Sequence, residues 1–553
     1  MSLKDLGLLF QFVGGLGMFL YGMNVMADGL QKSAGNRMKQ LLGFLTNNRL
    51  LAVIVGALIT AIIQSSSATT VMVVGFVNAS IINLTQAVGV IMGANIGTTI
   101  TSWIVSMNEF SDALSPEFFA PLVIGIGVFL TMFAKSGKKK DIGEIAVGFG
   151  VLFIGLSFMS DSITPYKDAP IFADAFRVLG SNPLLGILVG AVVTGILQSS
   201  SASVGILQTL AMNGVVNWNA AVFITLGQNI GTCVTALLSS LGANKTAKRA
   251  AVIHLLFNVL GAIIFGFVMF LVFAFNREFA SASISSMDIS IFHSIFNITV
   301  TIILFPFANA MVKISGLLVK DKESLEEKEV DVLEDVRRHL DERMLESPSF
   351  AVEAASIEVV HMGKFTMENL KNSIKAVVES KQELVNTVYK NEKIINQFQT
   401  LLTEYLVKVD SLSLTENQHM LIKNLLYTVT DIERVGDHSE NIAELAETKI
   451  NQKVSFSKEA EKDLLEISEK AGLAFENAIE ARDTESIDCV RKVAKYEDIV
   501  DDMEEELHEK HLERLSNQNC GVASGVIFLD IINNLERISD HALNISGYVQ
   551  DEL

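Results

Sequence analysis

A short polar segment, Gln-Ser-Ser-Ser-Ala, occurs twice between long apolar runs, at residues 64–68 and again at residues 198–202. The register of the two copies holds without a gap well beyond the motif itself. Further matched positions are Gly56/Gly190, Gly93/Gly227, Asn95/Asn229, Thr98/Thr232 and Thr101/Thr235. Because chance similarity of composition does not preserve register over such a length, the chain contains an internal repeat. A duplicated polar motif inside apolar sequence is typical of the binding site of a membrane transporter.

The charged residues divide the chain into two unlike parts. Residues 1–318 carry 16 Lys/Arg and 12 Asp/Glu, which lie between apolar segments of membrane length. Residues 319–553 carry the other 27 Lys/Arg and 50 Asp/Glu, a net charge of −23. We therefore expect the first part to span a bilayer and the second to be an acidic soluble domain. The three cysteines form no C-x-x-C pair, which favours a reducing cytoplasm for the soluble part.

Apolar segments of two lengths occur in the first part. Those long enough to span are 6–27, 84–105, 118–134, 143–160, 218–241, 250–275 and 291–318. Those too short are 50–63, 69–80, 184–197 and 203–215. A helix of about 14 residues reaches about 21 Å, whereas the hydrocarbon core is about 30 Å thick. The short segments flank the two QSSS motifs in pairs, which predicts two re-entrant helical hairpins whose tips meet near the membrane midplane.

The loops between these segments predict an orientation. The three basic loops are 28–49, 135–140 and 245–249. They hold 11 Lys/Arg, whereas the three loops expected on the opposite side hold three. By the positive-inside rule the basic loops are cytoplasmic, the amino terminus is outside and the acidic part is inside.

With seven spans, the two hairpins enter the membrane from opposite sides. Repeats of about 5–110 and 143–242 therefore have inverted topology. The predicted fold class is all-α, a polytopic membrane protein with two inverted-topology repeats, each containing a re-entrant helical hairpin.

The chemistry of the QSSS motifs suits an oxyanion. Ser hydroxyls donate and accept hydrogen bonds, the Gln amide adds donors, and a helix amino terminus offers free N–H groups at the positive end of its dipole. These groups can replace the water around phosphate or a similar tetrahedral anion without burying a cation. Hydroxyl and carbonyl oxygens also suit Na⁺, for which the candidate ligands are Thr98, Thr99, Thr101, Thr232 and Thr235. The alternative is that the small residues only permit close helix packing.

The QSSS motifs, the two Gly-x-Asn-Ile-Gly-Thr motifs and the inverted arrangement resemble the type II sodium/phosphate cotransporter family, across essentially all of residues 1–318. The resemblance implies symport, in which sodium drives inward transport of phosphate, and a substrate site framed by both motifs. An exporter within the same broad family remains open. The implied substrate-binding residues are Gln64, Ser65, Ser66, Ser67, Gln198, Ser199, Ser200 and Ser201, with Asn95 and Asn229.

The acidic half is itself duplicated. From about residue 349 to 551 apolar residues recur at helical spacing, and breaks near 380, 411, 452, 483 and 517 predict six helices in two three-helix bundles. Residues 535–541 repeat residues 432–438. The Glu-x-x-x-Asp spacing places Glu433 with Asp437, and Glu536 with Asp540, on one helix face, close enough to share a metal. The alternative is a solvated acidic face paired with the adjacent arginines.

This half resembles the PhoU family of phosphate-signalling regulators. The resemblance implies a divalent or iron-type metal at these four acidic residues, phosphate-signalling partner proteins, and a cytoplasmic domain at a prokaryotic cell (inner) membrane. Residues 319–348, rich in charge up to Pro348, are expected to link domain 1–318 to domain 349–553.

Several functions are disfavoured by missing motifs. The sequence has no G-x-x-x-x-G-K loop, no H-E-x-x-H and no G-x-S-x-G, so we expect neither an enzyme nor ATP-driven transport. No basic groove with aromatic residues indicates nucleic acid. The rival hypothesis is a membrane sensor that binds phosphate without transporting it and signals through the acidic half. Stoichiometry, transport direction, metal identity and oligomeric state, a dimer included, stay open.

Overall fold

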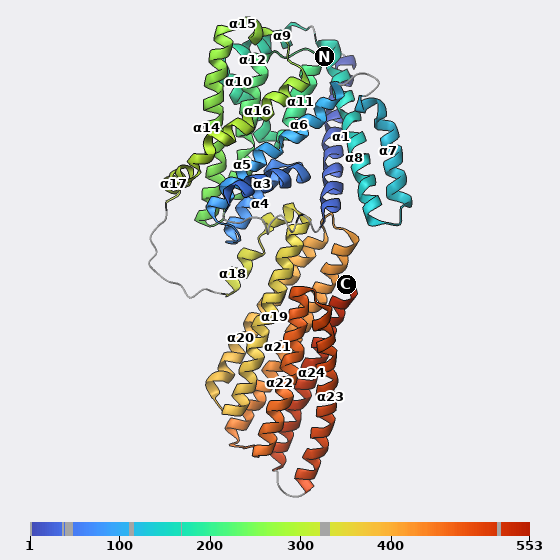
Figure 1. Cartoon of the computed structure of the whole chain (residues 1–553), viewed down its shortest axis with the longest axis vertical. Coiled ribbons are helices and arrows are strands. Elements are labelled where there is room, and N and C mark those ends of the chain that lie inside the picture. Colours follow the sequence, from blue (N-terminus) through green and yellow to red (C-terminus); the bar gives the residue numbers. More distant parts are fainter. Residues whose placement is uncertain are drawn as a thin grey trace. The chain divides into compact units, whose positions relative to one another are not determined.

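The computed structural model of the chain describes residues 3–35, 38, 48–109, 115–167, 169–320, 332–516 and 521–553. Within these ranges the chain is helical apart from short connections and one isolated bridge between Asn217 and Ser283. The all-α fold class is thereby confirmed. The helices form two units (Figure 1): a membrane unit, Met1–Glu327 with Asp341–Phe350, and a bundle unit, Lys328–Leu340 with Ala351–Leu553.

The membrane unit contains both long and short helices. Its long helices, with their extensions, are α1 (Leu3–Ala34), α5 (Leu84–Gly97), α6 (Thr99–Ser106), η1 (Met107–Glu109), α7 (Pro116–Phe133), α8 (Gly137–Ile163), η2 (Thr164–Tyr166), α12 (Trp218–Gly231), α13 (Cys233–Ser239), α14 (Lys245–Phe275), α16 (Ser286–Leu304), η3 (Phe305–Phe307) and α17 (Ala308–Leu318). The short hairpin helices are α3 (Arg49–Ile63), α4 (Ser66–Asn78), α10 (Pro183–Leu197) and α11 (Ser200–Met212). Two more, α9 (Pro170–Ser181) and α15 (Arg277–Ser281), lie in connections.

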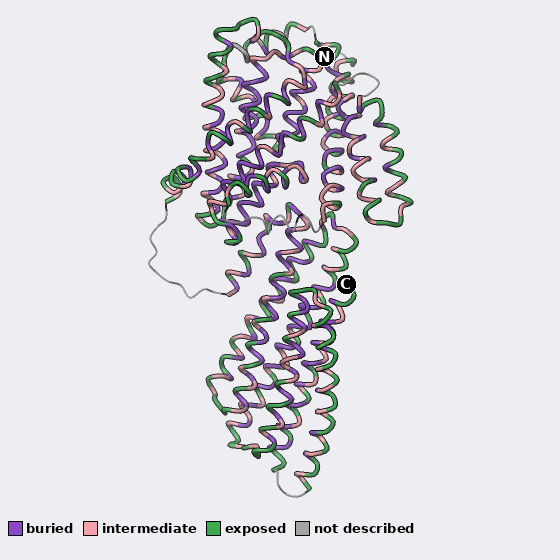
Figure 2. The backbone as a smooth tube through the Cα atoms, viewed as in Figure 1, coloured by how far each residue is buried: buried purple, intermediate pink, exposed green. Residues whose placement is uncertain are grey.

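Seven stretches of the described chain are long and apolar enough to cross a bilayer, and they coincide with the seven predicted spans. Their surfaces agree with this assignment. Phe118, Leu122, Phe129 and Met132 of α7 are each more than 60% exposed, as expected of side chains that contact lipid. Figure 2 shows exposed positions, in green, along this helix. The orientation in the membrane stays a prediction, and Arg37 and Lys39, which contribute to it, lie outside the described residues.

Two spans that the sequence predicts as continuous are broken at matched positions. Segment 84–105 divides at Thr98 into α5 and α6, and segment 218–241 divides at Thr232 into α12 and α13. Each short helix that enters a hairpin packs closely on the half-helix before the break. A Cβ added at Gly93 of α5 would lie 2.0 Å from the Val53 carbonyl oxygen, and one at Gly227 of α12 would lie 2.0 Å from that of Ile187. The repeat therefore includes the backbone packing as well as the motifs.

Residues Asp341–Phe350, which we call the strap, belong to the membrane unit although they follow α18 (Val332–His339) of the bundle unit. They include the 3-10 helix η4 (Glu342–Glu346) and the first turn of α19. The Phe350 ring meets the Phe76 ring of α4 edge-on, with 5.3 Å between centroids. Part of the predicted linker is thus packed structure, and residues 321–331 of it lie outside the described residues.

The bundle unit contains six long helices, as predicted: α19 (Pro348–Glu379), α20 (Gln382–Asp410), α21 (Glu416–Asn451), α22 (Lys458–Thr484), α23 (Ile487–Ser516) and α24 (Val522–Glu552). Three of them end at a left-handed residue, Ser380, Lys453 or Glu485, with φ of 52°, 53° and 53°. A residue of this conformation directs the chain out of a helix. The predicted breaks near 380, 452 and 483 correspond to these positions.

Candidate functional site

The two QSSS motifs form the same sharp turn between the two short helices of each hairpin. Gln64 (φ 58°, ψ 20°) and Gln198 (φ 51°, ψ 22°) are both left-handed, a conformation that costs a non-glycine residue about 1–2 kcal/mol. The next residues, Ser65 and Ser199, are extended and cap the returning helices. Their hydroxyls accept the N–H groups of Ala68 and Ala202 at 3.1 and 3.2 Å. Each tip therefore presents a helix amino terminus.

The structure brings the two tips together. The Oγ atoms of Ser66 and Ser200, the first residues of α4 and α11, lie 3.5 Å apart, and both residues are buried. The Ser201 hydroxyl lies 3.5 Å from the Gln64 carbonyl oxygen, to which it donates. Two helix amino termini and several hydroxyls thus converge, and the Gln and Ser residues of both tips carry no charge. This arrangement provides N–H and O–H donors for an anion, reinforced by the positive ends of two helix dipoles.

The surroundings of the two tips differ. Gln64 is buried; its Oε1 accepts the Thr101 hydroxyl at 2.9 Å, and its amide nitrogen donates to the Ala61 carbonyl. At the second tip Gln198 is exposed. Thr235, which matches Thr101, has a buried hydroxyl with no hydrogen-bond partner. The first tip is therefore held by a side-chain bond that the second tip does not make.

Two other predicted hydroxyls bond to carbonyls of the half-helix before each break. Thr99 donates to the Ile96 carbonyl at 2.8 Å, and Thr232 donates to the Asn229 carbonyl at 2.6 Å. Thr98 is buried at the break between α5 and α6. Of the threonines predicted to bind sodium, Thr101 is therefore the one whose side chain bonds to a residue of a QSSS tip among the described contacts.

The two predicted asparagines also have unlike partners. The Asn95 amide donates to the Ile91 carbonyl of its own helix at 2.9 Å. The Asn229 amide donates to Asn297 Oδ1 at 2.8 Å, and Asn229 Oδ1 lies 3.1 Å from His293 Nε2. Asn229 therefore joins α12 to α16, while Asn95 makes no such link among these bonds.

A buried polar cluster that the sequence analysis missed lies between α6, α11 and α16. Gln208 Nε2 lies within 3.0–3.2 Å of four oxygens: the Ser102 and Ser286 carbonyls and the hydroxyls of Ser286 and Ser290. The Ser102 and Ser290 hydroxyls are 2.9 Å apart. The available signals were a glutamine within the apolar sequence of α11 and two serines one helical turn apart in α16.

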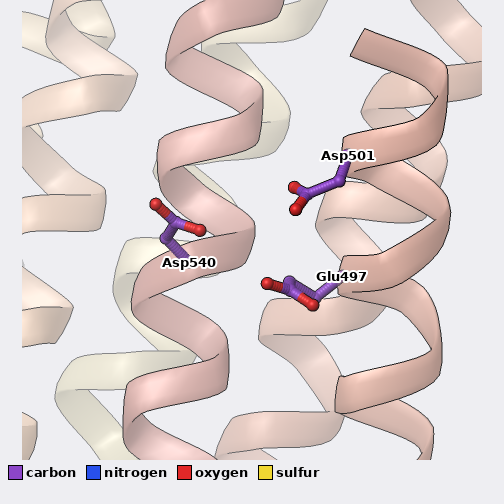
Figure 3. Close-up of side chains that lie close together, drawn as sticks. All are labelled: Glu497, Asp501 and Asp540. Carbon is purple, nitrogen blue, oxygen red and sulfur yellow. The ribbon is translucent and has the colours of Figure 1, made fainter. Parts of the chain in front are cut away.

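An acidic group in the bundle unit combines α23 with α24 (Figure 3). Glu497, Asp501 and Asp540 each offer a carboxylate oxygen within 4.8 Å of the others. Of the four predicted metal ligands, this group includes Asp540 alone. Glu497 and Asp501 were not predicted from the sequence. They lie in residues 493–501, which repeat residues 388–396, and this repeat was the available signal. In the first bundle the predicted ligand Asp437 forms an ion pair with Arg434, with 3.4 Å between Oδ2 and Nη1.

Glu392 of α20 matches Glu497 in that echo and is 2% exposed. Both of its carboxylate oxygens are buried without a hydrogen-bond partner. Burial first, and then the nearby Asp437, Glu440 and Glu433, raise the pKa of Glu392 to about 8. Burial and neighbouring carboxylates likewise raise the pKa of Glu497 and Asp501. Clustered carboxylates whose pKa values rise without a cation nearby fit a hard or transition-metal cation, which would favour their ionised form.

Comparison with known families agrees with this division of the chain. Residues 18–161 and 170–306 match the Na⁺/Pi-cotransporter family, and residues 359–446 and 464–549 match the PhoU domain.

Three relatives show which parts occur elsewhere. The "Putative inorganic phosphate export protein YjbB" of Escherichia coli is 23% identical over 548 residues, 98% of each chain. The "Uncharacterized protein YqeW" of Bacillus subtilis is 29% identical over 317 residues, 57% of this chain and 99% of its own. The human "Sodium-dependent phosphate transport protein 2B" is 34% identical over 111 residues, 20% of this chain and 16% of its own.

Proposed function

Because the chain belongs to the Na⁺/Pi-cotransporter family, we propose that it is a sodium-coupled secondary transporter of inorganic phosphate that binds its substrate between the two QSSS tips. The observation that carries this proposal is the 3.5 Å approach of the Ser66 and Ser200 hydroxyls at two helix amino termini. The human relative's name, a sodium-dependent phosphate transport protein, supports sodium as the coupling ion.

In this mechanism the tip hydroxyls and the first N–H groups of α4 and α11 take over the hydrogen bonds that water makes to phosphate. Ser67, whose buried hydroxyl has no partner, supplies one such donor. Phosphate is multiply charged, so nearby sodium lowers the cost of moving it into a low-dielectric site. The proposed sodium ligands lie at or after the breaks of the two spans: Thr98, Thr99, Thr101, Thr232 and Thr235.

Export is the second candidate, because the relative that matches 98% of this chain is named a putative phosphate export protein. A sensor that binds without transport is the third. The decisive experiment is flux of radiolabelled phosphate into proteoliposomes under an inward sodium gradient, with potassium as control. Symport predicts accumulation that sodium drives. Sodium-driven loss from preloaded vesicles supports export by antiport, and binding without flux supports a sensor.

We propose that the amino terminus lies outside a prokaryotic cell membrane and the bundle unit inside. The two hairpins then enter from opposite faces. Asn48 and Asn182 cap the first helix of each hairpin and occupy matched positions of the repeat, so they are matched reporters. In a protein without its native cysteines, Asn48→Cys and Asn182→Cys should react with an impermeant thiol reagent from opposite sides. Labelling of both from one side contradicts inverted topology.

We further propose that the bundle unit regulates transport through the strap. Asn78, the last residue of α4, donates to Asp341 Oδ2 at 2.7 Å, and Arg343 donates to the Ser239 carbonyl of α13 at 3.0 Å. Because α4 begins at Ser66, a shift of the strap acts on the helix that carries the first tip. The strap continues directly into α19, so metal or a partner protein that alters the bundles can reach the transport site by this route.

A metal in the bundle unit belongs to the same proposal. Its proposed ligands are Glu497, Asp501, Glu536 and Asp540 in the second bundle and Glu392, Glu433 and Asp437 in the first. The observation that supports a cation here is the carboxylate of Glu392, which is buried and has no hydrogen-bond partner.

A further inference from the structure

The second bundle contains a partly open cavity, with both polar and apolar residues in its lining, where three helices begin or end. The cavity, of about 70 Å³, is lined by the start of α22, the end of α23 and the start of α24. His511, which lines it, is 1% exposed, and its Nε2 has no hydrogen-bond partner. Arg514 also lines it. One guanidinium nitrogen, Nη1, donates to Asp463 at 2.9 Å, and the guanidinium lies over the Phe528 ring, with 5.2 Å between Cζ and the ring centroid. The buried Nε and Nη2 have no hydrogen-bond partner.

These unpartnered atoms specify what a ligand must offer. Arg514 Nε and Nη2 are donors only, and His511 Nε2 is a donor in one of its tautomers. Buried donors without partners are disfavoured, so a ligand with several acceptor atoms stabilises the site. The amino-terminal ends of α22 and α24 line the same cavity through Ser457 and Gly521, and they add the positive ends of two helix dipoles.

The first bundle shows that the fold does not need this polar group. The two bundles match helix by helix, with Glu476 opposite Glu368 in the alignment, Val493 opposite Val388 and Glu536 opposite Glu433. In this alignment the polar and small residues of the second bundle replace buried apolar ones, in the pairs Asp463/Ala355, His511/Leu406, Arg514/Val409 and Gly525/Ile422. A Cβ at Gly525 would lie 2.4 Å from His511 Nε2, so this glycine makes room for the imidazole.

From these observations we propose that the cavity is a binding site for a small tetrahedral oxyanion of the phosphate or sulfate class. Arg514 and His511 hold it with the amino termini of α22 and α24. Asp463 and the Phe528 ring fix the guanidinium, which leaves Nε and Nη2 to donate to the ligand. The bundle unit therefore senses the anion itself, at a site separate from the transmembrane tips and from the acidic metal group.

Hydrogen exchange of the full-length protein in detergent tests this site directly. Millimolar phosphate or sulfate, compared with chloride at equal ionic strength, should slow exchange in peptides that cover the start of α22 and the start of α24. Protection by either oxyanion supports the proposal. No protection by either one overturns it and leaves a cavity that holds water alone.

A variant that copies the first bundle supplies the second arm. The triple change Asp463→Ala, His511→Leu and Arg514→Val should preserve the helical content and abolish the protection. Affinity should fall on the order of ten- to a hundredfold, the usual effect of losing a charge-assisted hydrogen bond. Lys458→Gln removes an exposed charge at the start of α22 and should change nothing. Protection that survives in a folded triple variant contradicts the assignment. Peptides at the QSSS tips report the transport site separately.

Discussion

The two QSSS tips have the same backbone and different surroundings. Gln64 and Gln198 have nearly equal backbone angles, and Ser65 and Ser199 make the same cap. Yet Gln64 is buried and bonded to Thr101, whereas Gln198 is exposed and Thr235 has no partner. The strap contacts Asn78 at the far end of α4, while at the matching end of α11 Asn213 bonds to Ser160 of α8. A repeated motif therefore preserves local geometry, and its environment decides what each copy does.

The largest expected effect tests what the tips share. Ser66→Ala and Ser200→Ala should each weaken phosphate binding on the order of ten- to a hundredfold, because each removes a hydrogen bond to a charged ligand in a buried site. Equilibrium binding of labelled phosphate measures this. Ser162→Ala in α8 is the matched control, since its buried hydroxyl bonds only the Met159 carbonyl among the described contacts. Unchanged affinity in both folded tip variants would remove the motifs from the site.

A smaller effect tests how the tips differ. Thr101→Val removes the hydroxyl that holds Gln64, a neutral hydrogen bond of about 0.5–1.5 kcal/mol, so phosphate or sodium affinity should fall roughly two- to tenfold. Thr235→Val removes a buried hydroxyl without a hydrogen-bond partner, so only its proposed contact to sodium is lost and the affinity should fall less than in Thr101→Val. Sodium-dependent phosphate binding by the two variants compares them directly. Equal losses in both would show that the difference between the tips has no energetic meaning in the working protein.

Glu392 and Glu497 of the bundle unit also occupy matched positions of a repeat and differ in their surroundings. Because folding raises the pKa of Glu392 from 4.5 to about 8, the folded state keeps a proton that the unfolded state loses, and stability falls as pH rises between these values. In chelator, Glu392→Gln should therefore stabilise the bundle unit at pH 8 by on the order of 2–3 kcal/mol, or several degrees, and change little near pH 5.

The more exposed Glu497 supplies the matched comparison. Glu497→Gln should show the same trend with a smaller amplitude. Thermal unfolding of the bundle unit across this pH range measures both. A pH-independent difference between wild type and Glu392→Gln would contradict the proposed cause.

The smallest effect concerns the strap, which contacts the first hairpin. Arg343→Ala breaks the link between the strap and α13 and should change the rate of phosphate flux a few-fold while leaving phosphate affinity unchanged. Arg338→Ala, an exposed arginine in α18 that pairs only with neighbours on its own helix among the described contacts, is the control. Initial rates in proteoliposomes distinguish the two. Identical rates for Arg343→Ala, Arg338→Ala and wild type would leave the strap as a structural attachment.

The sequence predicted the elements of this fold because hydropathy and helical periodicity are local signals. The seven spans, the four short hairpin helices and the six bundle helices all follow from them. The breaks at Thr98 and Thr232 were missed because the single glycine before each, Gly97 and Gly231, is tolerated within a helix and the apolar pattern resumes a few residues later. The sequence predicts residues 341–348 of the strap as linker because they are rich in charge, and contacts such as that of Arg343 with Ser239 depend on tertiary structure.

The candidate sites show the same limit. The QSSS tips could be predicted to meet because duplication and span parity constrain them. The partners of Asn229 could not, because Asn297 and His293 lie on α16, which is distant from α12 along the chain. In the acidic group, Glu497 and Asp501 come from the neighbouring helix α23, so a search for spacing within one helix finds only Asp540 of the three.

The central claim is that the two tips enclose one phosphate ion, and cross-linking tests it most directly. Ser66→Cys and Ser200→Cys are placed together in a protein whose Cys233, Cys489 and Cys520 are replaced by serine. With the two Oγ positions 3.5 Å apart, mild oxidation should join the two cysteines, as mass spectrometry of the joined peptides would show. Phosphate in sodium buffer, at a concentration raised to offset the loss of both hydroxyls, should slow the reaction, and chloride at equal ionic strength should not. Absence of the cross-link, or a rate that phosphate leaves unchanged, would contradict a shared site between the tips.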